Sequence, residues 1–173
     1  MIHSRHIIIV LLAVFALLSV GCHHDSATMQ QLAGLDSMVY HQQEREALPI
    51  LQKINVKGFN DEEKSYYSLL LAMAQYKCYQ PFTSNSAISE AVEHYRKSGD
   101  KVKYLKALVA QGCVLEDLGH LDLAVESYHR AEELPLATDS SMIAYAKINS
   151  SSIDMELAKR VVSRFVNLKK QSV

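Results

Sequence analysis

The chain has 173 residues, of which 49% are hydrophobic and 21% are charged, and this balance excludes an intrinsically disordered or low-complexity protein. Its 18 Lys and Arg offset 19 Asp and Glu, so a net charge of -1 gives no overall positive field, and we expect no nucleic-acid partner. Three Cys are too few for a disulfide scaffold, and six Gly with three Pro are too few for the tight turns of a β-sandwich. The composition therefore predicts a folded, all-α protein.

An apolar run occupies residues 7–18 behind Arg5, and it is shorter than the ~20 residues of a membrane-spanning helix. Gly21 and Cys22 follow, and the segment resembles the lipobox of bacterial lipoproteins, where a small residue precedes the cysteine that receives the lipid. The resemblance implies a signal peptide over 1–21, lipidation of Cys22 and a tether over 22–28. We then expect a cell-envelope protein, anchored by its lipid to a membrane and facing the periplasm or the cell exterior. The alternative is an ordinary signal peptide, with Cys22 incidental.

Beyond the tether, apolar residues recur at intervals of three and four, which is the spacing of amphipathic helices. Short polar segments with Gly, Pro, Ser and Asn separate these stretches and have the caps and breakers expected between helices. We therefore predict eight helices in four antiparallel pairs. The predicted ranges are 29–40, 46–53, 62–79, 86–97, 102–118, 121–133, 140–149 and 155–169.

The third pair has the spacing of a tetratricopeptide repeat. Small residues at Gly112 and Ala124 let its two helices approach closely, and Gly119 allows the left-handed turn between them. The segment that begins at Gly119 recurs at Ile153, 34 residues later, which is the length of this repeat. We predict a best repeat over 105–138, a second over 139–172, and a domain over 29–173 that stacks its pairs as a short right-handed α-solenoid. A generic four-helix bundle is the alternative.

A closer resemblance rests on the segments 35–38, 47–54, 66–77 and 91–100, which are similar to lipid-anchored tetratricopeptide proteins of Gram-negative gut anaerobes. The resemblance implies a scaffold that binds a protein or peptide on its concave face, without catalytic residues. Members of that family often form the exported part of longer regulators. The resemblance therefore also implies an alternative role, as the ligand-sensing input module of a signalling system.

The residues give no support to catalysis or metal binding. Ser98 and Lys101 have the spacing of acyl-serine enzymes, but the partner motifs are missing, and a helix end with an N-cap explains them. Glu126 and His129 have the Glu-x-x-His spacing of di-iron helix bundles, but the second such motif that a di-iron centre needs is missing. We expect a non-enzymatic protein without cofactor or metal, and we expect Cys78 and Cys113 to be packed, reduced thiols rather than a disulfide.

In stacked helix pairs the first helix of each pair lines the inner face, which is the expected partner-binding surface. The alternative is a simply solvated face. The predicted surface residues are Gln75, Tyr79, Lys106, Val109, Cys113, Glu116, Ile143 and Lys147.

The last predicted helix has basic residues and no acidic residue over 157–173, together with an apolar set. Basic residues near a helix C-terminus stabilise its dipole, and anionic lipid headgroups or an acidic partner are the alternative explanation. The apolar residues form two adjacent stripes, from which we expect a protein contact at this end, through self-association or a partner. One stripe is Val161 with Phe165, the other is Val162 with Val166, and Leu168 adds to the apolar set.

Overall fold

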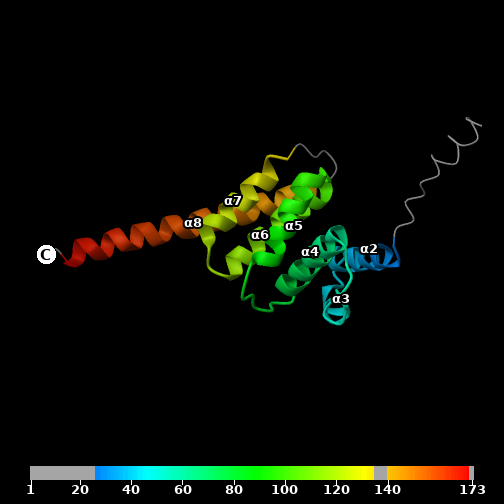
Figure 1. Ribbon diagram of the computed structural model, residues 1–173. Helices are drawn as coiled ribbons and strands as arrows, with labels where there is room; N and C mark the ends of the chain where they lie inside the picture. The colour runs from blue at the N-terminus through cyan, green and yellow to red at the C-terminus, as the bar shows by residue number, and fades with distance from the viewer. Residues whose placement is uncertain (1–25, 135–139, 172–173) are drawn as a thin grey trace, which may run out of the picture.

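The computed structural model describes residues 26–134 and 140–171, and all of their side chains except those at 140, 161, 162 and 164–171. These residues form α-helices joined by short loops, and no strand occurs in them (Figure 1). The all-α prediction is confirmed. The helices are α2 (Ala27–Tyr40), α3 (Glu44–Leu51), α4 (Asp61–Lys77), α5 (Ser86–Ser98), α6 (Lys101–Asp117), α7 (Leu121–Glu132) and α8 (Ser140–Gln171).

Side-chain caps fix where several of these helices begin. The Asn60 side chain accepts the backbone N–H of Glu63, and the Glu63 carboxylate accepts the backbone N–H of Asn60, so α4 begins with a complete capping box. Asp100 caps α6 in the same way, because its carboxylate accepts the N–H of Lys103 at 3.0 Å. The hydroxyl of Ser26 caps α2 and donates to Glu63 at 2.6 Å, which joins the start of α2 to the start of α4.

The helices pack in a regular order. Each helix contacts the next one in the chain, and α2, α4, α6 and α8 also contact each other in succession. Within the described residues, α3 does not contact α5, and α5 does not contact α7. The first helix of each predicted pair therefore lies in a continuous row, which we call the inner row, and α3, α5 and α7 lie outside it.

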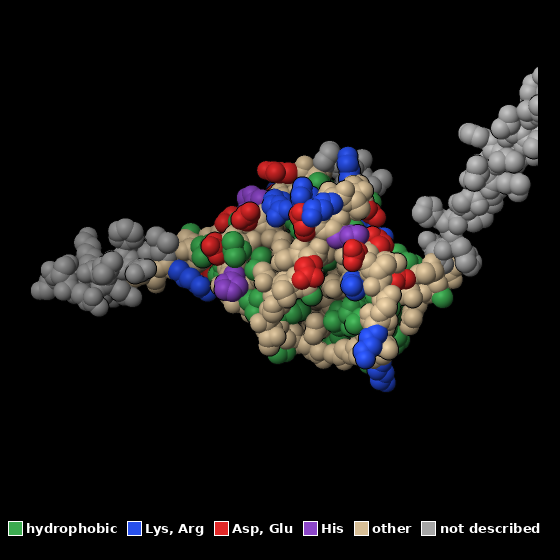
Figure 2. All heavy atoms as spheres, in the orientation of Figure 1, with side chains coloured by type: hydrophobic (Ala, Val, Ile, Leu, Met, Phe, Trp, Pro, Cys, Tyr) green, Lys and Arg blue, Asp and Glu red, His purple; other side chains and the backbone are tan. Residues whose placement is uncertain are grey.

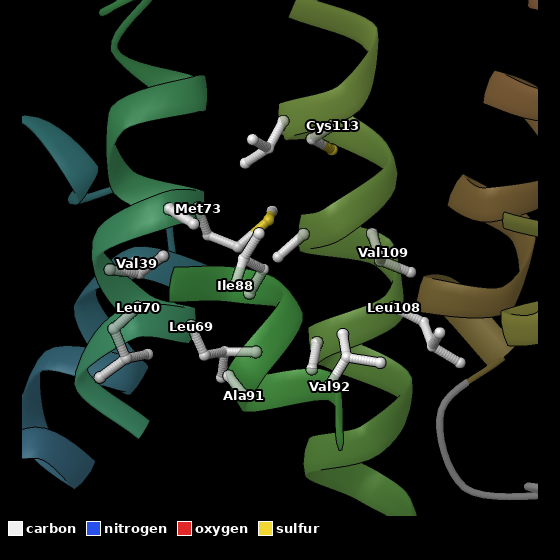
Figure 3. Packing of buried hydrophobic residues seen from close by; sticks show 14 of the residues in the cluster. Val39, Leu69, Leu70, Met73, Ile88, Ala91, Val92, Leu108, Val109 and Cys113 are labelled. Atoms are coloured by element: carbon white, nitrogen blue, oxygen red, sulfur yellow. The ribbon is translucent and has the colours of Figure 1, made fainter. Parts of the chain in front are cut away.

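One hydrophobic cluster runs from α2 to α8 through this packing. Figure 3 shows its centre, where Leu69 and Met73 of α4 meet Ile88 and Ala91 of α5, and the Leu108 side chain lies on the other side of α6. All five side chains are almost completely buried. The cluster packs the helices of the inner row against one another and against α5.

The prediction of a fourth helix pair is wrong, because residues 140–171 form a single helix of 32 residues. No Gly or Pro interrupts this sequence, so nothing forces a break at the run of three serines. Ser150 is buried, and its hydroxyl donates to Glu132 at 2.8 Å and lies 3.1 Å from the Lys147 carbonyl oxygen. The second half of the expected repeat over 139–172 thus continues the same helix, and α8 extends away from the body of the molecule (Figure 1).

Candidate binding site on the inner row of helices

A pocket of about 420 Å³ opens where the end of α2 meets α4, α6 and α8. All four helices of the inner row contribute to it, so residues far apart in the sequence meet there. Its lining residues are Tyr40, His41, Met73, Lys77, Lys106, Ser141, Met142 and Tyr145.

An ion pair between α2 and α6 fixes one wall of this pocket. The Lys106 ammonium contacts both carboxylate oxygens of Asp36, at 2.8 and 2.9 Å. The two side chains are only 15% and 20% exposed, so the pair is more shielded from water and salt than a surface salt bridge. Burial, together with the nearby negative charge of Asp36, raises the pKa of Tyr66. The ion pair with Asp36 positions Lys106 at the pocket.

The ring of Tyr40 lies next to both lysines of the pocket. The Lys106 ammonium is 4.3 Å from the ring centroid, and the Lys77 ammonium is 5.3 Å from it. Lys77 also donates to the backbone carbonyl of Val39 at 2.7 Å, where its positive charge offsets the negative end of the α2 dipole. Two cations therefore converge on one aromatic ring.

The wall on α8 is supported by a cluster of tyrosines around a thiol. The hydroxyl of Tyr145 lies 3.8 Å from the Cys113 sulfur, and the Tyr128 hydroxyl lies 3.4 Å from that sulfur and donates to Glu116 at 3.1 Å. Burial raises the pKa of Tyr145 to about 12 and that of Cys113 to about 11, so both groups are neutral at physiological pH. The neutral hydroxyl and thiol groups of the cluster support this wall by hydrogen bonds, and a thiol with a raised pKa is not activated as a nucleophile.

The pocket combines an apolar surface with positive charge. Met142 supplies a flexible, polarisable side chain above the buried Met73, Tyr40 and Tyr145 supply rings, and Lys106 with Lys77 supplies the charge. Asp36 neutralises one of the two lysines. This arrangement suits a ligand that presents an apolar group next to an anionic one.

The structure distributes the predicted surface residues unevenly. Lys106 alone among them lines the pocket. Gln75 of α4 and Glu116 of α6 are partly buried, Ile143 of α8 packs partly buried against the core, and Lys147 of α8 is exposed.

Three of the predicted surface positions need correction. Val109 and Cys113 are 0% and 1% exposed, because α6 is packed between α4 and α5 on one side and α7 and α8 on the other. Neither side chain has surface to offer a partner. Tyr79 is 92% exposed, but it lies beyond the end of α4 with a left-handed φ of 56°, and not on the inner row. Cys78 and Cys113 are free thiols, as the sequence predicted.

The sequence did not identify Tyr40, His41, Lys77 or Tyr145 as site residues. One signal was available for Lys77. It is the last residue of a helix, where a cation often stabilises the negative end of the helix dipole. The other three become a site only through contacts between helices. No spacing rule links the end of α2 to the start of α8.

Other candidate sites have less support or lie outside the described residues. Among residues 26–134 and the described part of α8, no three His, Cys, Asp or Glu side chains gather as they would around a metal ion. No helix in the described segments combines the length and apolar character needed to cross a bilayer. The signal peptide, Cys22 and most of the tether lie outside the described residues, as do the side chains of the apolar stripes near the C-terminus.

Comparisons with protein-family models, with curated proteins and with solved structures find no match to this chain.

Proposed function

We propose that the chain is an exported, lipid-anchored, tetratricopeptide-like scaffold that binds a protein or peptide on its inner row of helices. The proposed architecture is a short right-handed solenoid. The succession of contacts from α2 to α4, α6 and α8 supports it, because stacked antiparallel pairs place their first helices side by side.

The observation that carries the binding role is the pocket formed by all four inner helices. An extended peptide or a partner helix would place one apolar side chain against Met142 and Tyr145, with a neighbouring carboxylate near Lys77 and Lys106. The ion pair with Asp36 fixes the Lys106 side chain before any partner arrives. Less side-chain conformational entropy is therefore lost on binding.

Affinity capture from solubilised cell envelopes tests this role when the wild-type chain is compared with Lys77→Gln. We expect Lys77→Gln to lose the protein that the wild-type chain retains, and Lys97→Gln to retain it. Lys97 is a matched control, since its side chain is 68% exposed and does not line the pocket. Equal capture by all three chains would show that the pocket does not bind the captured protein.

A second candidate function is the sensing of a small ligand for a signalling system. The pocket volume of about 420 Å³ falls within the range of small-molecule sites and favours this alternative. Native mass spectrometry of the purified chain separates the two functions. A bound small molecule that disappears in Lys77→Gln would favour the sensor, whereas a protein complex would favour the scaffold.

The anchor is tested separately from the pocket. We expect Cys22→Ser to move the protein from the membrane fraction to the soluble fraction, since this change removes the acceptor for the lipid. Radiolabelled fatty acid is expected on the wild-type chain and not on the variant. A wild-type chain without label would refute the lipid anchor, but it would not count against the binding role of the pocket.

A further inference from the structure

A second groove lies at the end of the molecule where the described chain begins. Its volume is about 540 Å³, and it lies between the first turn of α2, the second half of α3 and the loop that leads to α4. The groove is lined by Thr28, Gln31, Pro49, Ile50, Lys53, Ile54, Asn55 and Phe59. We call this groove, with the adjoining Val56 and Lys57, the N-terminal end face.

Apolar side chains are exposed on this face. Ile50 is 42% exposed and Val56 is 40% exposed, and both belong to the few large apolar side chains that the described residues leave open to solvent. Pro49 is also exposed, and Ile54 and Phe59 are partly so. Figure 2 shows a hydrophobic patch beside α3, with Lys or Arg side chains at its outer edge.

The loop that presents Val56 and Lys57 has a fixed geometry. The Asn55 side chain accepts the N–H of Lys57 at 3.1 Å, and the Val56 carbonyl accepts the N–H of Phe59 at 3.2 Å. The Phe59 ring packs edge-on against Tyr67 of α4, with centroids 6.2 Å apart. The loop therefore holds its apolar and basic side chains outward without further ordering.

The charge of the face suits an anionic surface. Lys53 and Lys57 are exposed, and neither forms an ion pair with any residue that the structure describes. Each lysine near an anionic bilayer adds a favourable interaction with its surface potential. Apolar side chains flanked by lysines are the composition of interfacial membrane contacts.

The tether places this face close to the membrane. Thr28 of the groove follows Cys22 by six residues in the sequence, and six residues span at most about 20 Å. This step rests on the proposed function, because it requires a lipid on Cys22. A lipidated chain then carries the N-terminal end face within about one tether length of the headgroups.

We propose that the N-terminal end face docks on the surface of an anionic bilayer. Ile50 and Val56 enter the headgroup region, and Lys53 and Lys57 contact lipid phosphates. The lipid and the face form two membrane contacts on one short tether, and together they give the anchored domain a fixed orientation.

A single tryptophan tests the docking, because the chain has no Trp of its own. We expect the tryptophan of Val56→Trp, in the lipidated chain on phosphatidylcholine–phosphatidylglycerol vesicles, to shift to shorter wavelength and to be quenched by lipids brominated near the headgroup. The matched control is Leu123→Trp on α7, at a side chain that is 45% exposed. Its tryptophan should not be quenched. Co-sedimentation of the same samples reports the anchor, so an anchored chain without quenching at position 56 would overturn the docking alone.

The charge contribution is tested without the lipid. We expect the full mature chain with Cys22→Ser to bind the same vesicles weakly, and Lys53→Gln with Lys57→Gln to reduce that affinity by roughly thirtyfold. Lys97→Gln with Lys101→Gln changes the net charge equally and should reduce it much less. Loss of binding through Lys159→Gln with Arg160→Gln instead would place the contact on α8 and overturn the proposal. A shift at position 56 with soluble envelope proteins but not with vesicles would identify a protein partner and would also overturn it.

Discussion

The ring of Tyr128 lies directly on the backbone of Gly112. A Cβ atom at position 112 would come within 2.4 Å of Cε1 and within 2.6 Å of Cζ of this ring. Tyr128 is completely buried, and its hydroxyl is held by Cys113 and Glu116, so the ring cannot move aside freely. The contact fixes the distance between α6 and α7 and confirms the close approach that the sequence predicted there.

We predict that Gly112→Ala destabilises the protein by about 1 to 3 kcal/mol, since the added methyl group overpacks this contact. An alanine in a helix is otherwise favoured over glycine by about 1 kcal/mol, so the observed loss would be net of that gain. Urea denaturation of the two chains measures the difference.

Gly34→Ala is the matched control for this prediction. Gly34 also lies inside a helix, but nothing lies within 4 Å of a Cβ built there. We expect this change to stabilise the protein by about 0.5 to 1 kcal/mol. Equal effects of the two substitutions would contradict the packing of Tyr128 on Gly112.

The two free thiols are predicted to react in a fixed order. Cys113 is 1% exposed, and burial raises its pKa to about 11, whereas Cys78 is only partly buried. In the native Cys22→Ser chain, iodoacetamide should therefore modify Cys78 well before Cys113, and both should react in urea. Peptide mass spectrometry gives the order. Fast labelling of Cys113 would show that α6, α7 and α8 do not enclose it.

Glu62 is predicted to make a pH-dependent contribution to the stability of the fold. Burial raises the pKa of Glu62, but hydrogen bonds from Lys103 at 2.6 Å and His94 at 2.7 Å outweigh it and bring the pKa below the ordinary 4.5. The lowered pKa stabilises the fold above pH 4.5, and this contribution is lost as pH falls through the folded-state value.

Glu62→Gln should therefore differ most from the wild-type chain at neutral pH, and the difference in unfolding free energy should shrink as the solution is acidified. Denaturation curves over a series of acidic pH values test this expectation. Glu126→Gln, at an exposed side chain on α7, serves as the control. If the difference in unfolding free energy grew with acidification, the pKa of Glu62 would be raised in the folded state rather than lowered.

The helices from α4 to α7 were largely predictable because local signals define them. Asp100 caps α6, Gly119 takes a left-handed φ of 78° after it, and each predicted boundary lies within two residues of the observed one. The small side chain at Gly112 likewise indicated a close helix contact from its spacing alone. Such signals act within one helix or one turn, so the sequence is enough to read them.

The binding site was mostly unpredictable because it depends on distant residues. Asp36 and Lys106 are 70 positions apart, and only the packing of α2 and α6 on α4 brings them together. Spacing also placed Val109 on an exposed face, although helices on both sides bury it. Periodicity identifies a helix face, but it does not tell whether one neighbour or two cover that face.

The predicted break between the helices at 140–149 and 155–169 is wrong for a related reason. Serines such as those at 150–152 are common at helix ends because their hydroxyls compete for backbone groups. Here the Ser150 hydroxyl donates to Glu132 of α7 and lies near a carbonyl of its own helix, so packing against α7 keeps this serine inside the helix.

Ser151→Pro tests the continuity of α8 directly. Ser151 is exposed, so its replacement removes no core packing, but a proline there removes a helical hydrogen bond and clashes with the preceding turn. We predict a loss of about 3 kcal/mol in unfolding free energy, while Ser151→Ala should leave stability unchanged or slightly increased. A chain that tolerates the proline would instead support two helices with a break at the serines.

The outer side of α8 presents an exposed apolar stripe. Ile148 is 67% exposed and Met155 is 57% exposed, and together with Ala144 they line a shallow groove along the helix. The sequence continues the same spacing with Val162 and Val166, seven and eleven residues after Met155. A contiguous apolar stripe on an exposed helix marks a protein contact more often than a solvated surface.

We predict that the unlipidated chain self-associates through this stripe. Sedimentation equilibrium of the Cys22→Ser chain should show a mass that rises with concentration, and Ile148→Lys with Met155→Lys should return it to a monomer with unchanged helical circular dichroism. Leu123→Lys, at a side chain that is 45% exposed on α7, should leave association unchanged. Phe165→Asp extends the test to the C-terminal half of α8. If this change unfolds a chain that is monomeric at every concentration, the apolar residues there are part of the domain's own core, and the end of α8 is a cap rather than an interface.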